Sequence, residues 1–143
     1  MSLYDVRAVS YRYAGNGQSV SALVDVDLEV GTAEFLAIAG PSGSGKTTLL
    51  NLLGLLHGAD TGTIRFDGMD VSTLSERQRT RLRRERIAFI FQSFNLIPVL
   101  TAYENVEYVL LACPFPAAER RRRTLAALAA VAGSEFIAGD REA

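Results

Sequence analysis

The stretch GPSGSGKTT at residues 40–48 constrains the fold of this chain more than any other. A glycine, four intervening residues and then Gly-Lys-Thr is the spacing of a phosphate-binding loop. The apolar run FLAIA (35–39) precedes it and LLNLL (49–53) follows it, so we expect a strand, a turn and a helix. Glycines let the backbone turn its N–H groups toward an anion at the helix N-terminus. The stretch predicts a phosphate site; the alternative is a Gly/Ser turn that binds nothing.

Lys46 is the only lysine among fifteen basic residues. Because the chain uses arginine wherever it needs only positive charge, this exception indicates a requirement of the site. A compact ammonium reaches between β- and γ-phosphate oxygens where a planar guanidinium fits poorly. The next residue, Thr47, offers a hydroxyl to Mg²⁺, whose other ligands would be phosphate oxygens and water.

Composition excludes several classes of function. The 143 residues, 48% of them hydrophobic, are enough for one domain, and a net charge of -1 argues against a general affinity for nucleic acid. Cys113 is the single cysteine, so neither an internal disulfide nor a Cys/His metal site is expected. No apolar run approaches the roughly 18 residues of a membrane span, and the N-terminus lacks a signal-peptide pattern. We expect a cytoplasmic chain, or one held at a membrane by a partner.

Strand patterns flank the loop. Residues 3–13 are rich in β-branched and aromatic side chains and end at Tyr13, and glycines at 15 and 17 mark a turn. Residues 24–30 alternate apolar and acidic side chains, which predicts a strand with Val24 and every second residue after it on the apolar face. Residues 63–66 predict a further strand, with a turn at 67–68. Tyr13 is either ordinary strand packing or a flat ring on which adenine could stack.

A second apolar run, IAFIF (87–91), ends abruptly at Gln92. Without polar alternation it is typical of a parallel strand covered on both faces, as is 35–39. Ligands of such sheets gather at the carboxyl ends of the strands, so we expect Gln92 and the loop after Ala39 to face one crevice. Because no third such run occurs, we expect the chain to be the front portion of a larger doubly wound domain.

Three helices are expected in the rest of the chain. They cover residues 75–85, 101–112 and 117–131, the second opening with the capping-box spacing of Thr101 and Glu104. The arginines of the first and third helices suit a solvated face, the alternative being contacts with a partner or with phosphate. His57 is expected at the end of the helix that starts at Lys46; the alternative, a metal ligand, lacks a second His or Cys.

The chain resembles the ATP-binding cassette (ABC) transporter ATPases, especially those that serve lipoprotein release and macrolide export. The residues that carry the resemblance are VSYRY (9–13), GPSGSGKTTLL (40–50), IAFIFQSFNLIP (87–98) and LTAYENV (100–106). The phosphate loop alone fits many nucleotide-binding proteins, including kinases and GTPases, but the segment from Phe91 to Val106 fits neither of those classes. The resemblance implies an α/β fold of the P-loop NTPase type.

This resemblance implies roles for matching positions. Tyr13 would stack on the adenine of ATP, and Lys46 and Gln92 would act catalytically, with Gln92 sensing the γ-phosphate. Thr47 and Gln92 would hold Mg²⁺. The residues implied to bind ATP besides Tyr13 are Gly40, Pro41, Ser42, Gly43, Ser44, Gly45, Lys46, Thr47 and Thr48. The loop after Gln92 would face transmembrane permease subunits, a second nucleotide-binding subunit would complete a dimer, and the chain would lie at the inner face of the cell membrane.

The resemblance also implies a division of the chain. Residues 1–92 would form an N-terminal β subdomain with the P-loop core, and 93–143 the start of a helical subdomain of an incomplete nucleotide-binding domain. The LSGGQ-type signature, the strand ending in a Mg²⁺-binding Asp, the catalytic Glu and the switch His of the family have no match here. Asp140 and Glu142 lie in no apolar strand and are assigned no such role. We therefore expect the chain alone to bind MgATP weakly with negligible turnover; the alternative is a non-catalytic binding or regulatory module.

Overall fold

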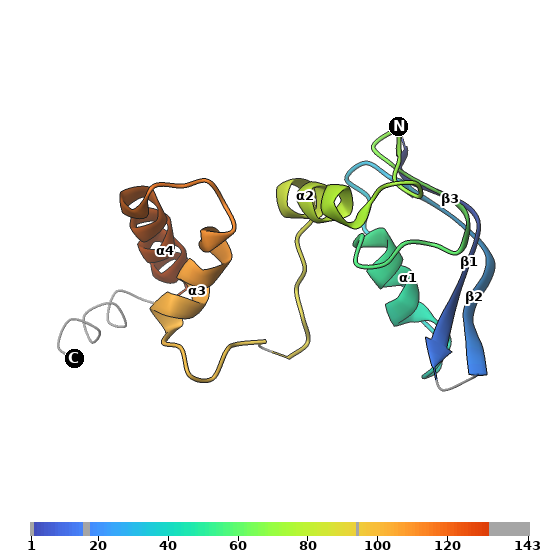
Figure 1. Cartoon of the computed structure of the whole chain (residues 1–143), viewed down its shortest axis with the longest axis horizontal. Helices are drawn as coiled ribbons and strands as arrows, with labels where there is room; N and C mark the ends of the chain where they lie inside the picture. Colours follow the sequence, from blue (N-terminus) through green and yellow to red (C-terminus); the bar gives the residue numbers. More distant parts are fainter. Residues whose placement is uncertain (1, 16–17, 94, 132–143) are drawn as a thin grey trace. The chain divides into compact units, whose positions relative to one another are not determined.

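The computed structural model describes residues 2–15, 18–93 and 95–131 of the chain. The chain forms two compact units, Met1–Ile90 and Phe91–Ala143. Figure 1 shows a sheet with helices in the first unit and a helix pair in the second. The two units are described separately below.

The first unit begins with two long strands, β1 (Ser2–Gly15) and β2 (Gln18–Gly31), which pair antiparallel. Their register ends at the pair Gly15–Gln18, so the predicted strand, turn and strand form a hairpin; residues 16 and 17 of the turn lie outside the described residues. Alternation of the side chains buries Val30 and partly buries Val26 and Leu28, while Asp27 and Glu29 between them face solvent. The hairpin confirms the two predicted strands.

Extra residues in both strands shift the register of the hairpin, which changes at four places. Ala8 in β1 and Asp25 in β2 both have a φ of 47°, and the register shifts beside each of them. The bulge at Asp25 reverses the alternation, so Leu23 is buried and Val24 is 67% exposed. The prediction that Val24 lies on the apolar face was therefore wrong, because periodicity alone does not reveal a bulge.

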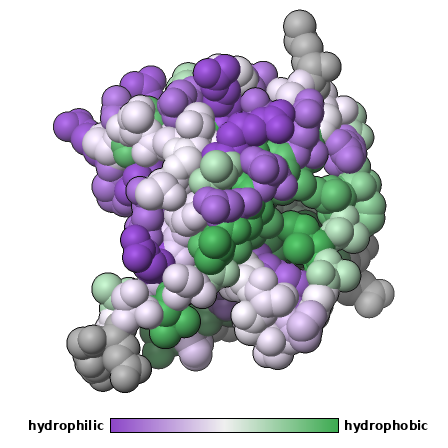
Figure 2. All heavy atoms as spheres, turned by 90° about the vertical axis from the view of Figure 1, so that its right-hand side faces the viewer, coloured by the Kyte–Doolittle hydropathy of each residue, from purple (hydrophilic) through white to green (hydrophobic). Residues whose placement is uncertain are grey.

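β3 (Thr61–Phe66) and β4 (Met69–Asp70) complete an antiparallel sheet of order β2-β1-β3-β4. The helix α1 (Lys46–Leu53) covers one face of this sheet, as Figure 1 shows, and buries Leu49 and Leu52 against it. The core also contains side chains from the strands and loops: Val6, Val9, Leu23, Leu55, Ile64, Phe66 and Val71. In Figure 2 the side of the molecule that carries the sheet faces the viewer, with hydrophobic residues around the centre and right and hydrophilic residues at the upper left.

The helix α2 (Glu76–Arg86) follows β4 and is capped by Ser75, which forms a capping box with Gln78. Its arginines divide between two environments. Arg83 donates to the carbonyl of Leu55 (2.7 Å), whereas Arg77 is exposed. The solvated face expected for this helix is present, but its other side fastens the loop that follows α1.

The two apolar runs 35–39 and 87–91 do not form strands, contrary to the sequence prediction. A strand needs a hydrogen-bonded neighbour, and the sheet of the described residues consists of the antiparallel strands β1 to β4, none of which pairs with either run. Phe35 is 94% exposed and Ile90 fully exposed. The sequence shows that these runs are apolar, but it does not show whether a neighbouring strand is available to pair with them.

The second unit contains α3 (Ala102–Leu111) and α4 (Ala117–Val131), which lie against each other. Thr101 and Glu104 form the predicted capping box, and α4 has the predicted bounds. Glu119 in the first turn of α4 accepts hydrogen bonds from Arg122 and Arg123, which lowers the pKa of its carboxyl to about 2. In the part of the chain that the structure describes, no helix has the length and apolar character needed to cross a membrane.

Candidate phosphate and nucleotide site

The glycines at 43 and 45 give the loop between residues 40 and 48 its shape. Gly43 has a φ of 78° and Gly45, the N-cap of α1, has a φ of 87°, in the left-handed region that other residues rarely adopt. A side chain at 45 would also meet the carbonyl oxygen of Ala22 at 2.5 Å. Only glycine allows the loop to approach β2 this closely while leading into the helix.

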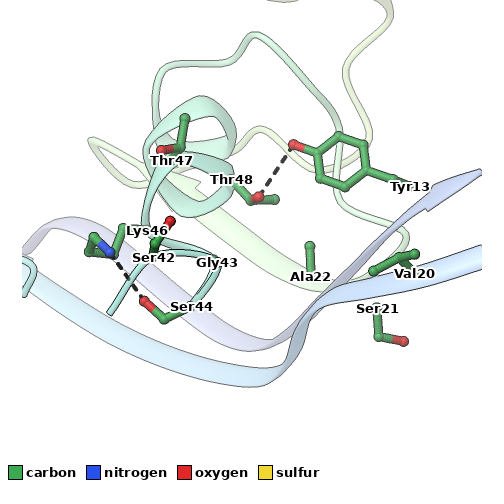
Figure 3. Close-up of a pocket in the computed structure, with 11 residues that line it drawn as sticks. Tyr13, Val20, Ser21, Ala22, Ser42, Gly43, Ser44, Lys46, Thr47 and Thr48 are labelled. Carbon is green, nitrogen blue, oxygen red and sulfur yellow. Dashed lines mark hydrogen bonds between the residues drawn. The ribbon is translucent and has the colours of Figure 1, made fainter. Parts of the chain in front are cut away.

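Lys46 folds back over its own loop. Its Nζ donates to the carbonyl oxygens of Gly40 (2.8 Å) and Pro41 (2.7 Å) and to Ser44 Oγ (3.3 Å). Figure 3 shows the ammonium beside Ser44. The contacts place one positive charge at the mouth of the loop, on acceptors that anionic oxygens could replace.

Tyr13 reaches the same region from the end of β1. Its hydroxyl lies 3.3 Å from Thr48 Oγ1, so the ring is anchored to the first turn of α1, and it remains 42% exposed. In Figure 3 Tyr13 points from its strand toward Thr48, at the opposite side of the view from Lys46. The structure therefore brings the predicted aromatic residue and the predicted phosphate loop to one site.

These residues line a pocket of about 340 Å³, which lies within the usual size range of small-molecule sites. Among its lining residues there is one cation and no carboxylate, which favours an anionic ligand. The lining residues are Tyr13, Val20, Ser21, Ala22, Ser42, Gly43, Ser44, Gly45, Lys46, Thr47 and Thr48. Eight of the ten predicted ATP-binding residues are thus in the lining. The remaining two, Gly40 and Pro41, do not line the pocket but accept hydrogen bonds from Lys46.

The same residues fit a phosphate chain with Mg²⁺. The loop offers its backbone amides and the N-terminus of α1, whose first turn contains no acidic residue to oppose an anion. Thr47, which carries a hydroxyl, borders the pocket at an exposed position. A single hydroxyl suits Mg²⁺ that takes its remaining ligands from phosphates and water. The described residues contain no group of three His, Cys, Asp or Glu side chains that could hold a metal alone.

Gln92 is exposed and belongs to the second unit. Its roles toward the γ-phosphate and Mg²⁺, and the crevice it was expected to share with the loop, stay predictions. His57 follows α1 rather than ending it, because the helix stops at Leu53, and its ring packs against Tyr11.

Sequence reasoning missed the contribution of β2 to the pocket. Val20 lies directly opposite Tyr13 in the hairpin, and Ser21 and Ala22 follow it along the wall. A signal was present: once residues 15–17 are assigned to a tight turn, the pairing of the two strands follows.

Comparison with known proteins identifies the family. The family model described as ABC transporter matches residues 23–141. The chain belongs to the ABC transporter family. Its fold class is the α/β class of the ABC-type P-loop NTPases, as the resemblance implied, with the antiparallel sheet described above.

Relatives of this family member include the macrolide export ATP-binding/permease protein MacB of Marinobacter nauticus, 47% identical over 113 residues, which are 78% of this chain and 18% of that protein. The pyoverdine export ATP-binding/permease protein PvdT of Pseudomonas aeruginosa is 43% identical, covering 88% of this chain and 19% of that protein. The dimeric post-hydrolysis structure of the ATP-binding cassette MJ0796 with ADP and Pi is 39% identical, with a TM-score of 0.75 over 87% of this chain and 55% of that one. The same cassette, from Methanocaldococcus jannaschii, is matched in sequence over 54% of its length. The chain thus spans about a fifth of the export proteins and about half of the cassette.

Proposed function

We propose that this chain binds MgATP as the nucleotide-binding part of an ABC transporter that drives export. The observation that carries the proposal is the pocket between the phosphate loop and Tyr13, with its single ammonium and its absence of lining carboxylates in the described residues. Membership of the ABC transporter family and the similarity to export ATP-binding proteins support the same ligand.

Within this proposal each residue has a distinct task. Lys46 exchanges its contacts with the carbonyls of Gly40 and Pro41 for β- and γ-phosphate oxygens, and the loop amides hold the remaining oxygens. Thr47 supplies a hydroxyl to Mg²⁺, which neutralises phosphate charge when bound. Tyr13 stacks on adenine, and Gln92 responds to the γ-phosphate and the metal.

Hydrolysis and transport need further parts. We propose ATP hydrolysis for the assembled transporter, with a second nucleotide-binding subunit and transmembrane permease subunits as partners at the inner face of the membrane. The name ATP-binding/permease of the export relatives and the dimeric MJ0796 structures support these partners. Since no carboxylate lines the pocket among the described residues to orient a water, we expect the chain alone to bind MgATP with negligible turnover.

Titration calorimetry with MgATP tests the proposal. We expect Lys46→Ala to weaken binding by about tenfold or more, because a charged hydrogen bond to phosphate contributes roughly 1.5–3 kcal/mol. Lys46→Arg should also weaken binding although it retains the charge, since a guanidinium does not fit the same position. The exposed Arg77→Ala on α2 is the matched control and should leave the affinity unchanged. Equal affinities in all four proteins would refute the assignment of Lys46.

A further inference from the structure

Three aromatic rings from two separate segments of the chain contact one another next to the pocket. Tyr11 and Tyr13 are neighbours on one face of β1, and His57 comes from the loop between α1 and β3. The ring centroids are 5.0 Å apart for the two tyrosines, 5.6 Å for Tyr11 and His57, and 6.5 Å for Tyr13 and His57. Of the three rings, only that of Tyr13 lines the pocket.

Tyr13 remains available to a ligand, because it is 42% exposed and lines the pocket. The ring plane of Tyr13 is at 85° to both Tyr11 and His57, which are themselves inclined by only 35°. Because the three centroids form a compact triangle, Tyr11 and His57 lie in similar directions from the centroid of Tyr13. Neither ring lies in the opposite direction, and the Tyr13 hydroxyl contacts Thr48 Oγ1.

The loop that carries His57 is fastened on both sides of this residue. Before it, the carbonyl of Leu55 accepts a hydrogen bond from Arg83 of α2 (2.7 Å). After it, the Asp60 amide donates to the carbonyl of Ser10 (3.0 Å), and its carboxylate accepts from the Arg12 amide (2.7 Å). The two bonds of Asp60 tie the loop to β1 on either side of Tyr11, and the bond of Arg83 ties it to α2. The fold therefore sets the position of His57, although its side chain is exposed.

We propose that His57 is a positioning residue for nucleotide binding: with Tyr11 it holds the Tyr13 ring in the orientation that receives a nucleobase. This inference rests on the proposed function and extends it to a residue outside the pocket. Edge-to-face aromatic contacts contribute about 0.5–1.5 kcal/mol beyond the burial of their area. Without the His57 ring, Tyr13 keeps its hydroxyl contact but loses one of its two aromatic supports.

If this proposal holds, His57 affects the affinity only for ligands that carry a nucleobase. A ligand that carries adenine needs the Tyr13 wall, whereas a bare triphosphate uses only the loop, Lys46 and Thr47. Removal of the His57 ring should therefore weaken MgATP and leave Mg-tripolyphosphate unaffected. A general loosening of the fold would weaken both ligands together.

The test measures both affinities by calorimetry for the full chain and for His57→Ala, His57→Phe and Tyr13→Ala. We expect His57→Ala to weaken MgATP binding about two- to twelvefold, the range that the aromatic contact energy converts to at a factor of ten per 1.4 kcal/mol. Its affinity for Mg-tripolyphosphate should stay within about twofold. His57→Phe, which retains a ring, should bind MgATP within about twofold of the unaltered chain, and Tyr13→Ala should lose at least as much as His57→Ala.

Three results would overturn the inference alone. An unchanged MgATP affinity in His57→Ala would show that the ring has no positioning role. A parallel loss of both ligands in His57→Ala, or a loss in His57→Phe equal to that in His57→Ala, would show a structural effect. These outcomes leave the proposed function intact, whereas failure of the unaltered chain to bind either ligand would overturn the inference and the proposed function together.

Discussion

The helix α1 and the run 87–91 are both apolar, but α1 places Leu49 and Leu52 in the core, whereas in the run Ile87 is only partly buried against it. α1 lies on the sheet and buries Leu52 completely, while Ile90 is fully exposed. The hydrogen bonds of a helix are satisfied within its own segment, and the hairpin β1–β2 beside it supplies a face to cover. An apolar run becomes a strand only with a neighbour to pair with. The phosphate loop keeps its shape because it leads into a helix, α1, and not into a strand that needs a partner.

The largest expected effect tests the packed side of this comparison. Leu52→Ala should lower the free energy of unfolding by about 2–5 kcal/mol, because it leaves a cavity in the core beneath the sheet. Leu50→Ala is the matched control in the same helix, since Leu50 is 53% exposed, and should cost much less. Urea unfolding followed by circular dichroism measures both. Similar losses in the two variants would contradict the burial pattern of α1.

An intermediate effect tests the attachment of α1 to β1. The Tyr4 hydroxyl donates to the carbonyl of Leu53 (2.8 Å), and burial raises the pKa of Tyr4 from 10.0 to about 12. Because the folded pKa is the higher one, the contribution of Tyr4 to stability is fully present below pH 10 and is lost as the pH rises toward 12. Tyr4→Phe should cost about 0.5–1.5 kcal/mol at neutral pH. In that variant, unfolding measurements between pH 9 and 12 should show a weaker loss with pH, and an unaltered loss would exclude Tyr4 as its source.

The smallest effect tests the exposed side. Ile90→Ser should change the free energy of unfolding by no more than about 0.5 kcal/mol, because no burial is lost at a fully exposed position. The same urea titration measures it. A loss comparable to that of Leu52→Ala would mean that Ile90 is packed in solution, and the contrast with α1 would fail.

The sequence predicted the local features of the fold well. Three such features each depend on only a few neighbouring residues, and each is present: the glycine spacing, the start of α1 at Lys46 and the capping box at Thr101. The β3–β4 hairpin likewise formed at the turn expected at residues 67–68. Such elements depend on backbone preferences and on bonds between near neighbours, which short patterns encode directly.

Features that depend on pairing at a distance were harder to predict. Leu23 replaced Val24 in the core because of a bulge, and the runs 35–39 and 87–91 formed no strands. The pocket wall from Val20 to Ala22 followed from the hairpin register rather than from any motif. The glycine loop therefore predicted the phosphate-binding part of the site, whereas the wall formed by β2 could be identified only from the pairing of the strands.

The bulges at Ala8 and Asp25 compensate each other. From the pair Val6–Leu28 to the pair Tyr11–Leu23 both strands advance by the same number of residues, because the extra residue beside Ala8 is balanced by the one beside Asp25. A one-residue deletion in β1 alone would turn Tyr13 to the opposite face, and one in β2 alone would turn Val20 away from the pocket. Length changes in this hairpin are therefore compatible with the nucleotide pocket only when they occur in matched pairs.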